Sequence, residues 1–254
     1  MTILNSTQDP LPAMQFRDLA GIFLCFLLCL IISSFGLSIL FERLATSTPA
    51  MLMLSGSSGD PQLAASGVAR LIKPWLIFAI LLLALKGHFP KESLRKILAL
   101  YGFGPLPSLK ILLCAIGAGI LVVQLFTKVL IPIFESEQTL IPHPSNELNA
   151  LPQLFLLLIV LNLFTLVPVA EEFLFRGVLY TGLAAIWNKP LAMIVTSVGF
   201  MALHPENLSS GSTLTHLGMV VITAMMVVAR EKSGALYVPI MLHAGFNFSS
   251  AVIS

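Results

Sequence analysis

The chain has 254 residues, of which 57% are hydrophobic and 10% are charged, and its mean hydropathy is +0.94. A soluble domain carries about 25% charged residues. A protein with a fully water-exposed surface is therefore excluded, and lipid is the expected solvent. The formal charge of +2, without a basic patch interleaved with aromatics, argues against nucleic acid as a partner. Three cysteines, an odd number with no CxxC pair, provide no disulfide framework.

Apolar runs separated by polar breaks predict an all-α fold, a polytopic transmembrane helical bundle of about eight spanning helices. The second span is the least regular, because Arg70, Lys73 and Pro74 interrupt its start. In chain order the predicted spans are Leu19–Phe41, Ala64–Leu85, Leu106–Phe134, Leu151–Ala170, Phe173–Trp187, Pro190–His204, Thr213–Arg230 and Gly234–Ile253.

The charges of two loops predict the orientation in the cell membrane. Lys86–Lys110 carries five basic residues and one acid, whereas Glu135–Ala150 carries three acids and no lysine or arginine. The positive-inside rule places the first loop in the cytoplasm and the second outside. With eight spans, both termini of this multi-pass protein are then cytoplasmic. Arg230 and Lys232 fall on the outer side in this scheme.

Two adjacent carboxylates follow the predicted fourth span. On a helix, Glu172 aligns with Arg176 four residues later and can form an ion pair with it. Glu171 points roughly 100° away from that pair, so its carboxylate remains available for proton transfer as a general base. The alternative is a helix end at the membrane interface, with Arg176 a positive charge on the inner side. On these residues alone, the two interpretations are equally supported.

Two further pairs of side chains share a helix face at i,i+4 spacing. Phe200 lies one turn before His204 and is expected to pack beneath its imidazole. His243 and Asn247 also project from one face and can both donate to a developing oxyanion. The small residues Ala244 and Gly245 let a neighbouring helix approach closely. The alternatives are a histidine that caps a helix C-terminus and a polar clasp between helices.

The predicted topology brings these groups to one depth. The fourth, sixth and eighth spans all run from outside to inside, which places Glu171, His204, His243 and Asn247 in one layer of the inner leaflet. Ionisable groups at membrane depth are expensive and mark functional sites. A shared layer on three helices therefore favours a catalytic site over unrelated structural roles.

The ordered motifs Glu-Glu-x-x-x-Arg, Phe-x-x-x-His and His-x-x-x-Asn in an apolar chain resemble the CPBP intramembrane proteases. That family includes CAAX prenyl endoproteases and bacterial proteins linked to bacteriocin processing or self-immunity. The resemblance covers residues 151–254. It implies a CPBP-like catalytic transmembrane domain there. For residues 1–150, hydropathy alone predicts the N-terminal transmembrane helices, about three in number, with their loops.

The resemblance also implies the roles of the site residues. Glu171 and His204 would activate a water, and His243 and Asn247 would stabilise the oxyanion. The supporting residues would be Glu172, Arg176 and Phe200. We expect no metal cofactor, because Asn247 is an unusual zinc ligand and a good donor to an oxyanion. If the enzyme depends on a divalent metal, most plausibly zinc, the ligands are Glu171, His204 and His243.

The sequence thus predicts an intramembrane endopeptidase that hydrolyses a peptide bond of a membrane-associated peptide or protein substrate from the cytoplasmic side. The alternative is a non-catalytic immunity or scaffold protein that retains the fold and sequesters a partner. A small transporter would show paired broken helices in two similar halves, and the two halves of this chain share no such pattern.

Overall fold

The computed structural model describes residues 15–31, 39–40, 43, 61–134, 152–204 and 212–253, and these contain helices and no strand. Three short segments, labelled η, are π-helical. The principal elements are α1 (Phe16–Ile31), α4 (Pro61–His88), α5 (Leu94–Leu100), α6 (Leu109–Gln124), η3 (Leu125–Leu130), α7 (Ile131–Phe134), α9 (Gln153–Phe164), α10 (Leu166–Glu172), η5 (Phe173–Leu179), α11 (Tyr180–Ile186), α12 (Lys189–Ala202), α14 (Thr213–Ser233), α15 (Tyr237–Phe248) and η6 (Ser249–Ile253).

Four helical stretches in the described residues are long and apolar enough to cross a membrane: 63–88, 109–134, 153–186 and 213–233. The shortest has 21 residues, about 31 Å at 1.5 Å per residue, and a bilayer core is about 30 Å thick. Large apolar side chains such as Leu83 and Leu121 point outward from these helices. The prediction of an all-α transmembrane bundle is confirmed.

The predicted fourth and fifth spans are wrong as separate helices, because residues 153–186 form one stretch of 34 residues. The charges that suggested a break neutralise each other within the helix, since Arg176 Nη1 lies 2.9 Å from Glu172 Oε1. The stretch turns instead at Thr165. Pro168 three residues later has no N–H for the carbonyl of Phe164, which explains a bend at this point.

The remaining predicted spans coincide in position with described helices, but α1, α12 and α15 as described are not among the four stretches long enough to cross a membrane. The interrupted second span lies within α4, which continues through Pro74, and the third corresponds to α6, η3 and α7. The first corresponds to α1 as far as Ile31, and its expected continuation includes residues 32–38, outside the described part. The loop at 135–150 and the turn at 205–211 also lie outside the described residues.

The basic loops gather at one end of the bundle. Leu236, just before α15, donates its N–H to the carbonyl of Gly102, 2.9 Å away, in the loop after α5. Gly102 has φ of +108°, and its Cα lies so close to the Arg230 guanidinium that a Cβ there would be 3.1 Å from it. Arg230 and Lys232 therefore lie at the same end as the loop that follows α4, and their predicted position on the opposite side is wrong.

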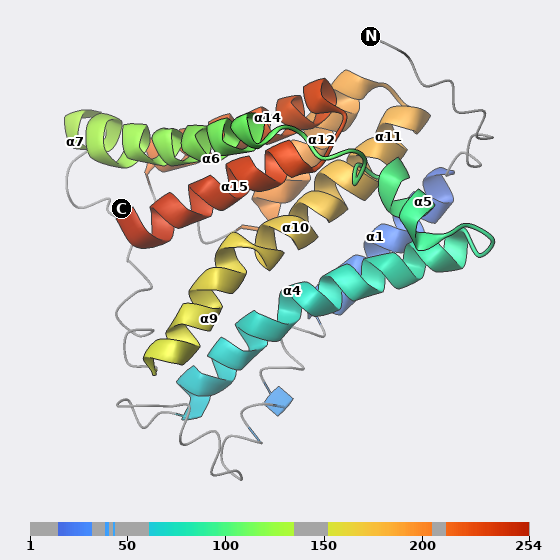
Figure 1. Cartoon of the computed structure of the whole chain (residues 1–254), viewed down its shortest axis with the longest axis horizontal. Helices are drawn as coiled ribbons and strands as arrows, with labels where there is room; N and C mark the ends of the chain where they lie inside the picture. Colours follow the sequence, from blue (N-terminus) through green and yellow to red (C-terminus); the bar gives the residue numbers. More distant parts are fainter. Residues whose placement is uncertain are drawn as a thin grey trace.

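This arrangement follows from the merged helix, because one span fewer reverses the direction of every later helix. Between α6 and η6, Gln124 donates to Ser249 at 2.7 Å, well away from the Gly102 end. Helix α15 thus leads away from the basic end (Figure 1). The expectation that both termini lie on the side of the basic loop does not hold for the described helices.

Two glycines let α15 pack directly on the backbone of α6. A Cβ on Gly245 would overlap the carbonyl oxygen of Ile116, and one on Gly119 would overlap that of Leu242. The close approach expected at Gly245 is thus present. It fixes the rotation of α15, so that His243 faces the interior of the bundle.

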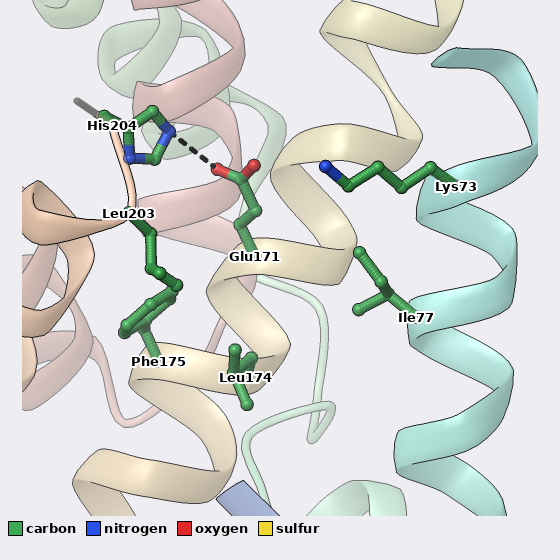
Figure 2. Close-up of a pocket in the computed structure, with 7 residues that line it drawn as sticks. All are labelled: Lys73, Ile77, Glu171, Leu174, Phe175, Leu203 and His204. Atoms are coloured by element: carbon green, nitrogen blue, oxygen red, sulfur yellow. Dashed lines mark ion pairs between the residues drawn. The ribbon is translucent and has the colours of Figure 1, made fainter. Parts of the chain in front are cut away.

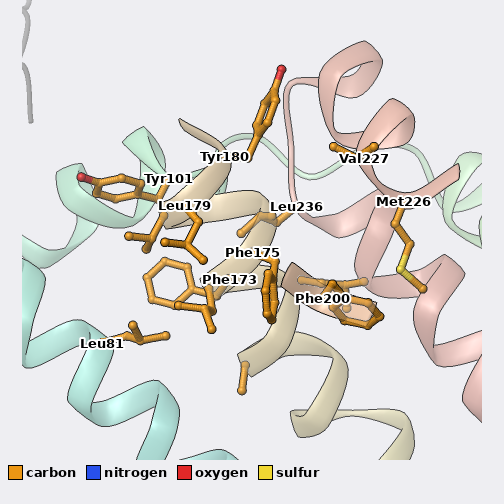
Figure 3. Close-up of a cluster of buried hydrophobic side chains, with 14 of the residues drawn as sticks. Leu81, Tyr101, Phe173, Phe175, Leu179, Tyr180, Phe200, Met226, Val227 and Leu236 are labelled. Atoms are coloured by element: carbon orange, nitrogen blue, oxygen red, sulfur yellow. The ribbon is translucent and has the colours of Figure 1, made fainter. Parts of the chain in front are cut away.

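A single hydrophobic cluster joins the two parts of the chain on either side of residue 150. All seven residues of η5 are buried. Figure 3 shows Phe173 and Phe175 of this segment at the centre, with Leu81 of α4 on one side and Phe200 of α12 on another. The first part of the chain is therefore packed into the same core as the part that carries the motifs.

We predict that Lys91 and Lys232, both exposed, face the cytoplasm, and that Phe134 at the end of α7 faces the other side. Single cysteines at these positions, in a chain without its own cysteines, would be labelled with a membrane-impermeant maleimide in intact cells and in inverted vesicles. Labelling of Lys91→Cys and Lys232→Cys from opposite sides would contradict the fold. Labelling of both from outside would contradict only the orientation.

Candidate active site

The two adjacent glutamates have different environments. The side chains of Glu172 and Arg176 are both fully buried and form the predicted ion pair. Glu171 lies on a different face of α10, and its side chain is 27% exposed. Glu171 sits near the middle of the 153–186 stretch and not at a helix end, so the expected layer at the cytoplasmic helix ends is wrong.

The buried carboxylate of Glu172 also orients His243. Nδ1 of His243 lies 3.0 Å from Glu172 Oε1, the same oxygen that accepts from Arg176. An ionised carboxylate only accepts hydrogen bonds, so His243 donates through Nδ1–H. Its Nε2 is then left as an acceptor, 3.8 Å from Glu171 Oε2.

His204 presents the same nitrogen to the same carboxylate. It follows α12 by two residues, and its Nδ1–H donates to the carbonyl of Phe200 at 2.8 Å. Its Nε2 lies 3.7 Å from Glu171 Oε2. The C-terminus of α12 thus orients the imidazole through a backbone carbonyl, while a carboxylate orients the imidazole of His243.

Phe200 packs against both imidazoles and against the buried cation. Its ring centroid lies 4.6 Å from that of His204 and 5.7 Å from that of His243. The guanidinium carbon of Arg176 lies 4.3 Å from the same centroid, within the range of a cation–π interaction. The predicted packing of Phe200 beneath His204 is present, and the ring holds three polar side chains in place.

A pocket of about 80 Å³ opens beside Glu171 (Figure 2). A water needs roughly 10–15 Å³ by the same measure, so the pocket has room for water and part of a substrate. Glu171 Oε2 is buried and has no hydrogen-bond partner among the described residues. The pocket is lined by Lys73, Ile77, Glu171, Leu174, Phe175, Leu203 and His204.

Glu171 Oε2 and the Nε2 atoms of both histidines converge beside this pocket, which Glu171 and His204 line. With both imidazoles neutral, all three atoms are hydrogen-bond acceptors. Acceptors do not satisfy one another, so a group that supplies hydrogens has to lie between them. Distances of 3.7 and 3.8 Å are too long for direct hydrogen bonds and suit a bridging water. Such a water can donate one hydrogen to Glu171 and the other to His204.

Asn247 lies one turn beyond His243 and contacts a different element. Its Nδ2 donates to the carbonyl of Leu163, 3.0 Å away, at the end of α9. The contact ties α15 to the bend at Thr165. The structure therefore brings Glu171, His204 and His243 together, and it places Asn247 against α9 with one amide hydrogen engaged there.

One carboxylate and two imidazoles, the groups of Glu171, His204 and His243, also make up some zinc sites, in which three protein ligands leave one position open. Among the residues described, no group of three or more His, Cys, Asp or Glu side chains is arranged so that it could hold a metal ion. As placed, Glu171, His204 and His243 do not fit a preformed metal site.

Lys73 of α4 is a pocket residue that the sequence patterns did not indicate. They marked it only as an interruption at the start of a span. The signal that could have found it is an ionisable side chain within a long apolar stretch, which is functional by default.

Comparison with known proteins agrees with this site. Residues 152–249 match the model of the Rce1-like family, type II CAAX prenyl endopeptidases. The predicted resemblance to the CPBP intramembrane proteases is confirmed over these residues. The matched part contains all seven predicted site residues and lies wholly after Lys73. Residues 152–249 thus resemble a family of proteases.

One curated protein resembles a part of this chain that is similar in length to the family match. It is described as an uncharacterized 24.3 kDa protein of Escherichia coli and is 34% identical to this chain over 91 residues. The match covers 34% of this chain and 40% of that protein. The chain thus matches less than half the length of this relative. No solved structure matches the chain.

We predict that Arg176→Ala lowers both folded yield and activity. It leaves Glu172 as an unpaired buried charge, which costs roughly 3–5 kcal/mol of stability, and it removes the cation that packs on Phe200. Melting in detergent, followed by size-exclusion chromatography, would measure the loss. The matched control is Arg95→Ala, because Arg95 is exposed on α5. Unchanged stability with abolished turnover would contradict a structural ion pair and assign Arg176 to the chemistry.

Proposed function

We propose that the protein is an intramembrane endopeptidase that hydrolyses a peptide bond of a membrane-associated peptide or protein. The observation that carries the proposal is the convergence of Glu171 Oε2 with the Nε2 atoms of His204 and His243 beside a pocket in a bundle of apolar helices. A protease-family domain over the same residues supports it.

In the first step, a water bound between Glu171 and His204 attacks the carbonyl carbon of the scissile bond. Glu171 accepts one proton of this water as the new C–O bond forms, and His204 Nε2 accepts a hydrogen bond from the other hydrogen. The carbonyl π electrons move to oxygen and give a tetrahedral oxyanion. General-base catalysis of this kind contributes about 10²–10⁴-fold in rate.

The oxyanion is stabilised by His243 and by the free amide hydrogen of Asn247. Glu172 holds the imidazole of His243 in place through Nδ1, and His243 donates to the oxyanion through Nε2 when that nitrogen has taken up a proton from solvent. In the second step the carbonyl re-forms and the C–N bond breaks. The proton held by Glu171 moves to the departing amine nitrogen, so that the products are a carboxylic acid and an amine and Glu171 is a carboxylate again.

We predict that Glu171→Gln abolishes cleavage while leaving the fold intact, because the amide keeps the shape and cannot accept the proton. Peptides from membranes of cells with wild-type protein, Glu171→Gln or Glu92→Gln would be compared by mass spectrometry. Glu92 is the matched control, since it pairs with Lys96 outside the spanning helices. Peptides present with wild type and Glu92→Gln and absent with Glu171→Gln define the substrate.

Identical peptides in all three membranes would contradict the enzyme assignment. If Glu171→Gln also kept any biological effect of the wild-type protein, a non-catalytic scaffold or immunity role would replace it.

The hydrolysis that we propose needs no metal ion. Purified protein should then keep its activity after dialysis against a strong chelator and should hold no stoichiometric zinc by elemental analysis. One metal per chain, lost together with activity in His204→Ala and His243→Ala, would overturn this part of the proposal and leave the peptidase assignment standing.

A further inference from the structure

Lys73 places an ammonium group at the pocket from a helix outside the family match. It lies near the middle of the spanning stretch 63–88 and lines the same pocket as Glu171 and His204. A charged side chain at the centre of a spanning helix costs about 2.5–3.5 kcal/mol on insertion scales. Such a cost indicates a function for the charge where it sits.

The direction of the side chain is informative. Figure 2 shows Lys73 reaching from α4 toward Glu171, on the opposite side of that carboxylate from His204. The other lining side chains near it are apolar, with Ile77 and Leu174 below the ammonium. A carbonyl group bound in this pocket therefore lies between the group that activates water and a cation.

We propose that Lys73 is a further catalytic residue, which donates hydrogen bonds to the oxyanion formed at the scissile carbonyl. The proposal rests on the hydrolysis proposed above and adds to it a residue from the N-terminal helices. An ammonium group carries three donors and a full positive charge. Beside apolar side chains such as Ile77 and Leu174, such a charge stabilises a developing oxyanion more strongly than in water.

Asn247 and His243, the oxyanion donors proposed above, leave the oxyanion with few hydrogen bonds. One amide hydrogen of Asn247 is engaged by the Leu163 carbonyl at 3.0 Å. His243 donates toward the pocket only after gaining a second proton, because its Nδ1–H is bonded to Glu172.

An anionic group of the substrate is the other partner that Lys73 is able to bind. About 80 Å³ accommodates a water and a peptide group beside Glu171, and apolar side chains close the space around them. A lysine that bound a substrate carboxylate would contribute to ground-state binding. A lysine that binds the oxyanion contributes only in the transition state, and kinetics distinguish the two.

The test uses purified full-length protein in lipid nanodiscs and a quenched fluorescent peptide that contains a cleavage sequence lost in Glu171→Gln. Lys73→Gln removes the charge, Lys73→Arg keeps it, and Arg70→Gln removes the exposed charge one turn earlier on α4 as the matched control. A phosphonamidate peptide of the same sequence is the second probe, because its tetrahedral anionic phosphorus imitates the intermediate.

Lys73→Gln should lower kcat by about 10²–10³-fold, the usual effect of losing one oxyanion donor, with KM unchanged. The phosphonamidate should lose affinity in parallel, Lys73→Arg should recover most of the lost kcat, and Arg70→Gln should behave as wild type. If Lys73→Gln does not fold, the kcat of Lys73→Arg is compared with that of Arg70→Gln. A loss of kcat in Lys73→Arg as deep as that of Glu171→Gln would then overturn the proposal.

A rise in KM with kcat and phosphonamidate affinity unchanged would also overturn it and would make Lys73 a substrate-binding residue. Equal kinetics in Lys73→Gln and Arg70→Gln would show that Lys73 has no part in the reaction. In both cases the inactivity of Glu171→Gln keeps the peptidase assignment intact. Cleavage that persists in Glu171→Gln would instead disprove the proposed function itself.

Discussion

The buried carboxylate of Glu172 joins the elements that make up the site. A fully buried charge is tolerated only when it is paired and hydrogen-bonded, and Glu172 Oε1 accepts from both Arg176 and His243. Because Arg176 packs on the ring of Phe200, the same pairing reaches α12. The position of α15 and the orientation of the His243 ring therefore depend on a residue that does not face the pocket.

That arrangement separates structure from chemistry in two consecutive residues. Arg176 forms its ion pair with Glu172 inside the bundle. Glu171 therefore faces the pocket as a carboxylate that is not paired with this arginine. Both histidines use Nδ1–H for a fixed partner, a carboxylate in one case and a backbone carbonyl in the other. In the proposed mechanism, their Nε2 atoms hold water beside Glu171. The glycine contact between α6 and α15 keeps His243 within this range.

Local spacing along a helix was sufficient to predict much of the site. The i,i+4 rule gave the Glu172–Arg176 ion pair and the Phe200–His204 contact, because both lie within one helix or at its end. It did not predict the continuous helix around Glu171, since a charged cluster usually ends a span, whereas this one is paired internally. The contacts of Lys73 and of Asn247 with other helices depend on packing across the bundle, and no local pattern encodes them. The error in the side of Arg230 followed from the miscounted helix.

We expect Glu172 to keep the proton of the His243 imidazole on Nδ1, so that the Nε2 atom that faces Glu171 is unprotonated. Nitrogen-15 NMR of imidazole-labelled protein in nanodiscs measures this directly, with the His243 signals assigned by their loss in His243→Gln. The account predicts a protonated Nδ1 and an unprotonated Nε2 in the resting protein, and a change of that pattern in Glu172→Gln. A proton on Nε2 with a bare Nδ1, unaffected by Glu172→Gln, would contradict it.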